Sequence, residues 1–234
     1  MSDQLKQRVY EANMALQRHG LVVFTWGNVS GIDRDRGVVA IKPSGVSYAD
    51  LTPQGIVLVD LQGNVIEGDL RPSSDTPTHL ELYRSFPGLG GICHTHSRYA
   101  TMWAQAQREI PCFGTTHADH FYGPVPVTDA LVRDEIDGPY EQNTGRVIVR
   151  RFAQLDPLQM PAVLVANHGP FTWGKDPAQS VENAVVLEQV AMMAYGTLLV
   201  NARQSGIAQA LLDRHYLRKH GKDAYYGQAN KAEE

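Results

Sequence analysis

The period of the apolar positions changes several times along the chain, which predicts a mixture of helices and strands. Over residues 5–19, apolar side chains recur every three or four positions and Gly20 follows, a pattern typical of an amphipathic helix and its stop. Residues 21–26 are β-branched and aromatic, which predicts a strand. Hairpins are predicted within 29–41 and within 56–67, each across a short turn-forming segment.

The second half alternates short apolar runs with longer helical patterns. Runs at 89–95 and 161–166 have the length of strands. Strands and helices alternate with no repeat or linker between them, so the chain is predicted to be one α/β or α+β domain with its strand order left open. Helices are predicted over 79–86, 98–104, 140–155, 177–201 and 207–220, with a loop over 111–127 and a further short helix capped by Thr128 or Asp129.

Composition limits the classes of function. The chain has 234 residues, 43% of them hydrophobic, and a net charge of −4 without a basic stripe, which argues against nucleic acid as a partner. The N-terminal segment lacks the apolar core of a signal peptide, and no apolar run approaches the length of a membrane span, so no membrane association is expected. Cys93 and Cys112 lack metal-site spacing, and a reduced, cytoplasmic setting is expected, with Cys93 facing the core.

Three histidines follow apolar runs of strand length. His94 and His96 come at the end of the run 89–95, and alternate side chains of a strand share a face. His168 follows the run 161–166 in a similar setting. A catalytic zinc is usually bound by three side chains, such as neutral imidazoles, and keeps one coordination position open. These three residues are therefore candidate metal ligands; the alternative is that they are histidines packed in the protein without a metal.

Three loops are suited to an anion. Residues 27–28, 42–45 and 71–75 carry small, hydroxyl or amide side chains, and the third precedes a predicted helix whose N-terminal N–H groups attract phosphate. Lys42 adds a positive charge. The alternative is that these are ordinary turns and a helix cap. Asp75 could cap the helix, or supply a carboxylate beside a metal as a fourth ligand or a base.

The remaining polar residues are open to more than one interpretation. Asp119, in an unusually polar segment, could act as an acid or base, or be a plain surface residue. His79 lies inside a predicted helix and is expected to be structural or solvated. His117, His120, His215 and His220 receive no role.

Together and in this order, five motifs resemble the class II aldolase/epimerase family over nearly the whole chain. They are Gly27-Asn28, Lys42-Pro43-Ser44-Gly45, Ser73-Ser74-Asp75, His94-Thr95-His96-Ser97 and Asn167-His168-Gly169. Residues 72–76, 115–119, 167–174 and 212–228 are further similar to the L-ribulose-5-phosphate 4-epimerases of that family. The family's sugar-phosphate aldolases usually carry glutamate where this chain has Asp75. Asn167 departs slightly from several relatives.

The resemblance implies a fold and an assembly. It implies one domain over residues 1–234, an α/β/α three-layer arrangement around a central, largely antiparallel sheet. It also implies a homotetramer with active sites at subunit interfaces, to which the tail, about 221–234, contributes.

The resemblance also implies roles for individual residues. A divalent metal, zinc with Mn²⁺ or Co²⁺ as substitutes, would be bound by His94, His96 and His168, with Asp75 at or near it. Asp119 and Tyr226 would be an acid/base pair that reaches into a neighbour's site. The phosphate of a pentulose phosphate would be held by Gly27, Asn28, Lys42, Ser44, Gly45, Ser73 and Ser74.

The implied reaction explains these residue types. Carbon 4 of ribulose 5-phosphate is not next to the ketone, so its C–H is not acidic. Retro-aldol cleavage of C3–C4, rotation of the aldehyde and re-addition would invert C4, with Lewis-acid help at the ketone and one proton-transfer group on each face. The alternatives are a fuculose- or rhamnulose-phosphate type aldolase, a zinc hydrolase, which the absence of an HExxH spacing disfavours, and a protein that binds without turnover.

Overall fold

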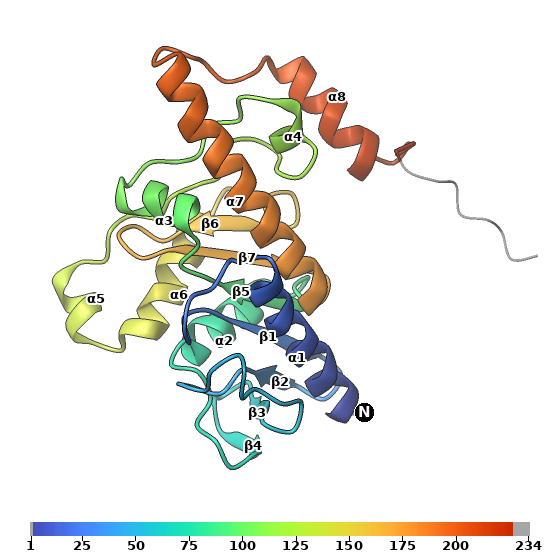
Figure 1. Cartoon of the computed structure of the whole chain (residues 1–234), viewed down its shortest axis with the longest axis vertical. Helices are drawn as coiled ribbons and strands as arrows, with labels where there is room; N and C mark the ends of the chain where they lie inside the picture. Colours follow the sequence, from blue (N-terminus) through green and yellow to red (C-terminus); the bar gives the residue numbers. More distant parts are fainter. Residues whose placement is uncertain (1, 227–234) are drawn as a thin grey trace, which may run out of the picture.

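The computed structural model describes residues 2–226, and within them the chain is organised around one antiparallel sheet (Figure 1). The strand order is β4-β3-β2-β1-β5-β7-β6, and every neighbouring pair runs antiparallel. The strands are β1 Asn28–Asp33, β2 Val38–Ile41, β3 Val57–Asp60, β4 Val65–Glu67, β5 Gly91–His94, β6 Ala162–Leu164 and β7 Pro170–Gly174.

Helices cover both faces of the sheet, so the three-layer expectation is confirmed. Helices α1 (Ser2–Arg18) and α7 (Pro177–Val200) pack on one face, in front of the sheet in Figure 1. Helices α2 (Thr76–Ser85) and α6 (Tyr140–Arg151) lie behind it and pack on each other. Because a strand is pleated, successive side chains point to opposite layers. Ala40 packs with residues of α1, for example, whereas its neighbour Val39 packs with residues of α2.

The remaining helices are short or lie at the margins. Helix α3 (Arg98–Gln105) follows the histidine strand, and α5 (Arg133–Asp137) precedes α6. Helices α4 (Thr115–Ala118) and α8 (Gln209–His220) pack together at one end of the molecule, far from β4 (Figure 1). Their contact buries a small apolar cluster of Cys112, Ala118 and Leu212, and Tyr122 donates a hydrogen bond to Asp213 over 2.6 Å.

The loop predicted over 111–127 contains the short helix α4 (Thr115–Ala118). Two other local predictions are wrong because they depended on tertiary context. Residues 21–26 form no strand, because both edges of β1 are already paired with β2 and β5, and Phe24 has a φ of +54° that breaks an extended path. Thr128 caps no helix; its hydroxyl accepts a hydrogen bond from the Ala166 amide, and α5 begins only after Val132. Strand β7, which was not anticipated, completes the sheet.

Helix α7 corrects the expectation about membrane-length segments. Its 24 residues include an 18-residue window with a mean hydropathy of 1.4, so by length and composition it could cross a membrane. In the structure it packs against β5, β7, α1 and α3, and it buries Val181, Leu187 and Ala191 among other residues. A central helix of a core meets the same criterion of length and composition, and 39% of this window is buried. The C-terminal part of α7 leaves apolar side chains such as Leu199 and Val200 exposed.

Candidate active site

Three histidine rings meet where β5 and the β6–β7 turn end side by side. The ring centroid of His94 lies 4.9 Å from that of His96 and 4.8 Å from that of His168, and the last two lie 5.1 Å apart. One ring nitrogen from each residue lies within 4.8 Å of the others. Sequence spacing predicted this grouping, although His96 falls just beyond the strand rather than within it.

The orientation of His94 is fixed from two sides. Its Nδ1 lies 2.9 Å from the carbonyl oxygen of Pro170, and its ring stacks on Phe171 with centroids 4.2 Å apart. Because a carbonyl can only accept, Nδ1 carries the proton, and the lone pair on Nε2 is left for a ligand. This backbone contact is the usual support of a metal-binding imidazole.

The turn that presents His168 depends on Asn167, a residue that sequence reasoning treated as incidental. Asn167 has a φ of +61°, a left-handed conformation that asparagine tolerates better than most residues. The backbone N–H of Asn167 donates to the Ala104 carbonyl, and the side-chain amide of Gln107 donates to Asn167 Oδ1. The Asn-His-Gly sequence is itself a turn signal and could have revealed this role.

The histidine cluster fits a divalent metal ion. His168 Nδ1 is buried and has no hydrogen-bond partner, so it has a free lone pair or proton inside the site. Burial, followed by His94 and His96, lowers the pKa of His168 to about 4, and burial also lowers that of His96. Both rings are therefore neutral at pH 7 and can act as ligands, a nitrogen set that suits zinc.

Asp75 turns its carboxylate into the site instead of capping α2. It occupies the N-cap position, but its side chain makes no capping hydrogen bond and accepts one from Asn28 Nδ2 over 2.6 Å. Burial raises the pKa of Asp75, yet His94, His79 and the Asn28 amide outweigh this effect and lower it overall. The carboxylate is ionised at neutral pH and lines the same cavity as the three histidines. It does not belong to the group of ligand atoms that lie within 4.8 Å of one another, which among the described residues only the three histidines form.

The three loops come together at the same cavity. The Ser44 amide donates to the Arg71 carbonyl over 2.9 Å, and the Ser73 amide donates to the Lys42 carbonyl over 3.0 Å. Asn28 Nδ2 lies 3.1 Å from Ser73 Oγ and joins the first loop to the third. The cavity has a volume of about 410 Å³, and its lining includes Gly27, Asn28, Lys42, Ser44, Gly45, Ser73, Ser74, Asp75, His94, His96 and His168, together with Thr25, Trp26 and Pro43.

Lys42 lines this cavity and also contacts its own loop. Its side chain is buried, and Nζ donates to the Val46 carbonyl over 2.6 Å and lies 5.0 Å from the ring centroid of Tyr48. Burial lowers the pKa of Lys42 below its usual value. The ammonium therefore closes the 42–46 loop and places a positive charge at the cavity.

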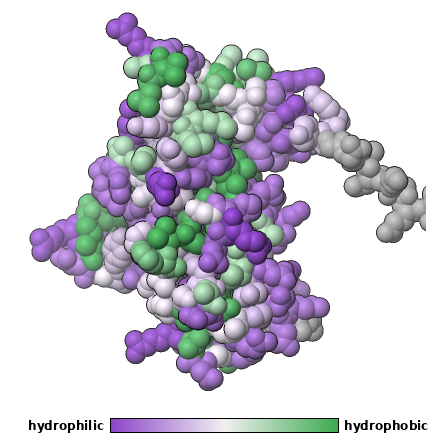
Figure 2. Space-filling view, viewed as in Figure 1, coloured by the Kyte–Doolittle hydropathy of each residue, from purple (hydrophilic) through white to green (hydrophobic). Residues whose placement is uncertain are grey.

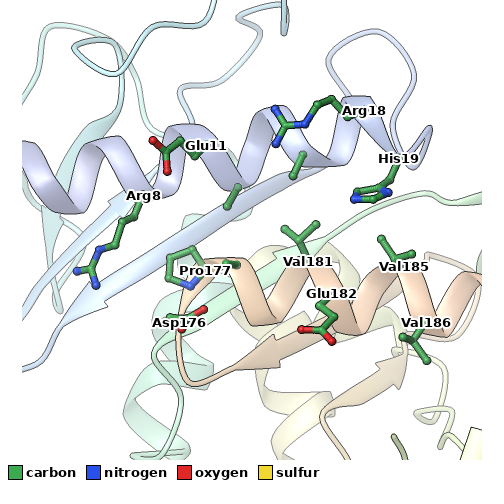
Figure 3. A pocket seen from close by; sticks show the side chains of 13 residues that line it. Arg8, Glu11, Arg18, His19, Asp176, Pro177, Val181, Glu182, Val185 and Val186 are labelled. Carbon is green, nitrogen blue, oxygen red and sulfur yellow. The ribbon is translucent and has the colours of Figure 1, made fainter. Parts of the chain in front are cut away.

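A larger groove lies elsewhere, between α1 and α7 (Figure 3). Its volume is about 510 Å³, but its floor is made of small apolar side chains such as Ala12, Ala15 and Val181. Arg8 and Glu182 are among the charged residues at its sides. It includes none of the grouped histidines, so size alone does not identify the site of chemistry.

Asp119 lies outside the histidine cavity of its own chain. It ends α4, and Arg218 from α8 clasps it with contacts of 2.7 Å to Oδ2 and 2.9 Å to Oδ1. His215 Nδ1 lies 3.0 Å from Oδ1, and Lys219 Nζ lies 3.5 Å from Oδ2. Burial raises the pKa of Asp119, but Arg218, His215 and Lys219 together lower it, so the carboxylate is ionised.

Tyr226 stands beside Asp119 and is exposed. Its ring centroid lies 4.8 Å from the Arg218 guanidinium and 4.4 Å from Lys219 Nζ, and its amide donates to the Arg218 carbonyl. Tyr226 and Asp119 line a separate cavity of about 390 Å³. The structure thus brings the two residues together but does not place them with the histidines of the same chain. The tail beyond residue 226 lies outside the described residues.

Two other histidines are structural. His79 is fully buried, its Nδ1 lies 2.7 Å from Ser30 Oγ, and burial lowers its pKa to about 3. His117 donates from Nε2 to the Gly123 carbonyl, and burial lowers its pKa to about 4. His79 is therefore packed in the core rather than solvated.

Comparisons with known proteins agree with this fold. Residues 7–195 match the family described as the class II aldolase and adducin N-terminal domain. An L-fuculose 1-phosphate aldolase superposes with a TM-score of 0.73 at 24% identity, over 93% of this chain and 96% of that one. A putative aldolase/epimerase/decarboxylase from Klebsiella pneumoniae superposes with a TM-score of 0.71 at 26% identity, over 92% and 98%. The match over most of its length shows that this chain belongs to the class II aldolase and adducin family.

Proposed function

We propose that this protein is a metal-dependent epimerase that interconverts L-ribulose 5-phosphate and D-xylulose 5-phosphate. It works in the cytoplasm, in an arabinose, ascorbate or other pentose route. Its two cysteines are free and buried, as in a reducing compartment. It acts as a homotetramer whose active sites combine residues of neighbouring subunits.

The observation that carries the proposal is the cluster around Asp119 and Tyr226. An epimerase that cleaves and remakes a bond at C4 needs a proton-transfer group on each face of the aldehyde, whereas substrate binding alone needs neither. Here a carboxylate held by Arg218 and an exposed phenol lie side by side at the end of the molecule formed by α4 and α8. Their separation from the histidines of the same chain favours delivery to a neighbour's site.

A surface suited to self-association lies at the same end. The C-terminal part of α7 exposes Leu199 and Val200, and apolar surface covers this region in Figure 2. Helix α8 exposes Leu211 and Leu217. Exposed apolar side chains gathered on adjacent elements are typical of an interface, and they support an assembly that uses this end of the chain.

In the proposed reaction, this chain's residues bind the substrate and move its protons. The histidines, with Asp75, would hold the divalent ion, which supplies a Lewis acid at the ketone oxygen. The C4 hydroxyl gives its proton to whichever member of the pair is deprotonated, Asp119 as a carboxylate or Tyr226 as a phenolate. The C3–C4 bond then breaks, and its electron pair stays on C3 next to the carbonyl. C4 becomes an aldehyde, which rotates, and the second group returns a proton to its oxygen when the bond re-forms on the opposite face.

The loops at 27–28, 42–45 and 73–74 would hold the phosphate. We expect Ser44→Ala to raise KM for the sugar phosphate about tenfold, the cost of about 1.4 kcal/mol for one lost hydrogen bond to a charged group. Zinc content should stay unchanged, because Ser44 is not among the grouped metal ligands. Steady-state kinetics with metal analysis would check this. An unchanged KM, or equal use of unphosphorylated L-ribulose, would argue against a phosphate site.

Sites shared between subunits can be tested with mixed oligomers. We expect His96→Asn and Tyr226→Phe proteins to be nearly inactive separately, and to recover about a quarter of the wild-type activity after their subunits exchange. Each restored site would take its histidines from one chain and its tyrosine from the next. If exchange is demonstrated by mass spectrometry and activity does not return, both residues serve the site of one chain and the intersubunit arrangement is wrong.

The second candidate is a sugar-phosphate aldolase of the fuculose- or rhamnulose-phosphate type. It is favoured by structural neighbours that bear the name L-fuculose 1-phosphate aldolase, including one from Thermus thermophilus with a TM-score of 0.69 at 22% identity. Asp75, where those aldolases usually carry glutamate, favours the epimerase instead.

The two candidates differ in whether the fragments leave the enzyme. The metal-loaded protein should be incubated separately with L-ribulose 5-phosphate and L-fuculose 1-phosphate, with released aldehyde detected through a coupled reductase. The epimerase predicts little free aldehyde from either substrate. Rapid aldehyde release from L-fuculose 1-phosphate would select the aldolase.

A further inference from the structure

Trp26 is an exposed aromatic residue at the wall of the histidine cavity. Its side chain is 52% exposed, whereas the other tryptophans, Trp103 and Trp173, are 7% and 1% exposed. The Trp26 ring centroid lies 6.3 Å from that of His96, and the phosphate-loop residues Gly27 and Asn28 follow it directly. The indole therefore lines the cavity beside His96 and directly precedes the first of the three loops.

The backbone holds this indole in place at some conformational cost. The Trp26 amide donates to the Val23 carbonyl over 3.1 Å, and the Tyr48 hydroxyl donates to the Gly27 carbonyl over 3.0 Å. Phe24, with its φ of +54°, sets its ring edge against the indole, 5.8 Å between centroids. Backbone strain of this kind persists where the surrounding structure enforces it, and it is concentrated at functional sites.

We propose that Trp26 is a specificity-determining residue that packs against the phosphate-bearing fragment of the substrate and retains it after C3–C4 cleavage. This inference rests on the proposed function for its reaction, and on the cavity geometry for the contact itself. The fragment is a two-carbon phosphorylated aldehyde, attached to the protein only through its phosphate once the bond is broken.

The chemistry of an indole suits this task. Its flat apolar face covers the C–H groups of a short carbon chain and keeps water away, but it makes no hydrogen bond that would fix the aldehyde in one orientation. The aldehyde can therefore turn while the fragment stays bound. Without the ring, a fragment held only by its phosphate loses one of the side chains that line the cavity.

Binding can be measured without turnover, using 2-phosphoglycolate as the probe of the fragment and inorganic phosphate as the probe of the loops alone. We expect Trp26→Ala to weaken 2-phosphoglycolate binding to the zinc-loaded protein about tenfold by calorimetry, and to leave phosphate binding unchanged. Trp26→Phe should retain most of the affinity. Val23→Ala is the matched control, because Val23 is a similarly exposed side chain of the same segment that does not line the cavity.

Tryptophan fluorescence gives a second readout that a purely structural role would not change. The probe should alter the emission of the wild-type protein and not that of Trp26→Phe, whose remaining tryptophans are buried. With L-ribulose 5-phosphate, Trp26→Ala should release several times more free aldehyde per epimer formed than the wild type.

The outcomes separate this inference from the proposed function. If Trp26→Ala binds 2-phosphoglycolate as well as the wild type does, the contact is absent and the inference is wrong. If affinity falls only because the oligomer dissociates, as light scattering would reveal, Trp26 is an interface residue and the inference is also wrong. If the probe depends on Trp26 but the wild type forms no epimer, the contact stands and the proposed function fails.

Discussion

Replacing His94, His96 or His168 with asparagine is expected to remove metal and activity together. Each substitution takes one nitrogen from a set whose ring centroids lie about 5 Å apart. Losing a residue that only orients a metal ligand typically costs about 10–100-fold in affinity or activity, and the loss of a direct ligand should exceed that. Chelation of the wild-type protein should have the same effect and be reversed by added zinc.

Metal content by mass spectrometry and activity after zinc loading would check this expectation. His19→Asn is the matched control, because His19 is an exposed histidine outside the cluster. Full metal occupancy in any one of the three variants would remove that residue from the set of ligands. Loss of activity with full occupancy would instead assign the residue to substrate binding.

The second large effect is expected from Tyr226→Phe. This change removes one hydroxyl and keeps the ring that packs on Arg218 and Lys219, so folding should be unaffected. If the phenol transfers a proton at the C4 oxygen, kcat should fall by about two to four powers of ten, the usual contribution of a general acid or base. Steady-state kinetics should show this with unchanged metal content and thermal stability.

Tyr225→Phe provides the control, since Tyr225 is an equally exposed neighbour whose ring lies 5.4 Å from the Arg214 guanidinium. It should keep near-normal activity. A packing role for Tyr226 predicts the reverse of our expectation, namely retained activity with at most a small loss of stability. Near-normal epimerisation by Tyr226→Phe would contradict the scheme in which one proton-transfer group acts on each face of the aldehyde.

The local chemistry of the site was predictable because it follows from short-range patterns. His94 and His168 each come at or after the end of an apolar run of strand length, and the three cavity loops are turn formers next to strand or helix ends. The hairpins and most helices followed from periodicity for the same reason. The sequence indicated only that Asn167 belongs to a turn. The structure adds that its left-handed φ helps to orient the next residue, the candidate ligand His168.

What sequence patterns could not supply was the pairing between distant segments. Residues 21–26 have strand propensity, but β1 has no free edge to pair with them. The hydrogen-bonded ion pair between Arg218 and Asp119 joins residues 99 apart in the sequence, and no local pattern predicts it. Helix α7 has the length and composition of a membrane span, and only the structure shows its contacts with the sheet and with α1 and α3.

The most direct test of the central claim is to follow the zinc-loaded protein with L-ribulose 5-phosphate in D₂O by NMR. Epimerisation through C3–C4 cleavage predicts D-xylulose 5-phosphate that carries no deuterium at C3 or C4, because neither C–H bond breaks. Formation of separate aldehyde and ketone fragments without the epimer, or an epimer that carries deuterium at C4, would contradict the account.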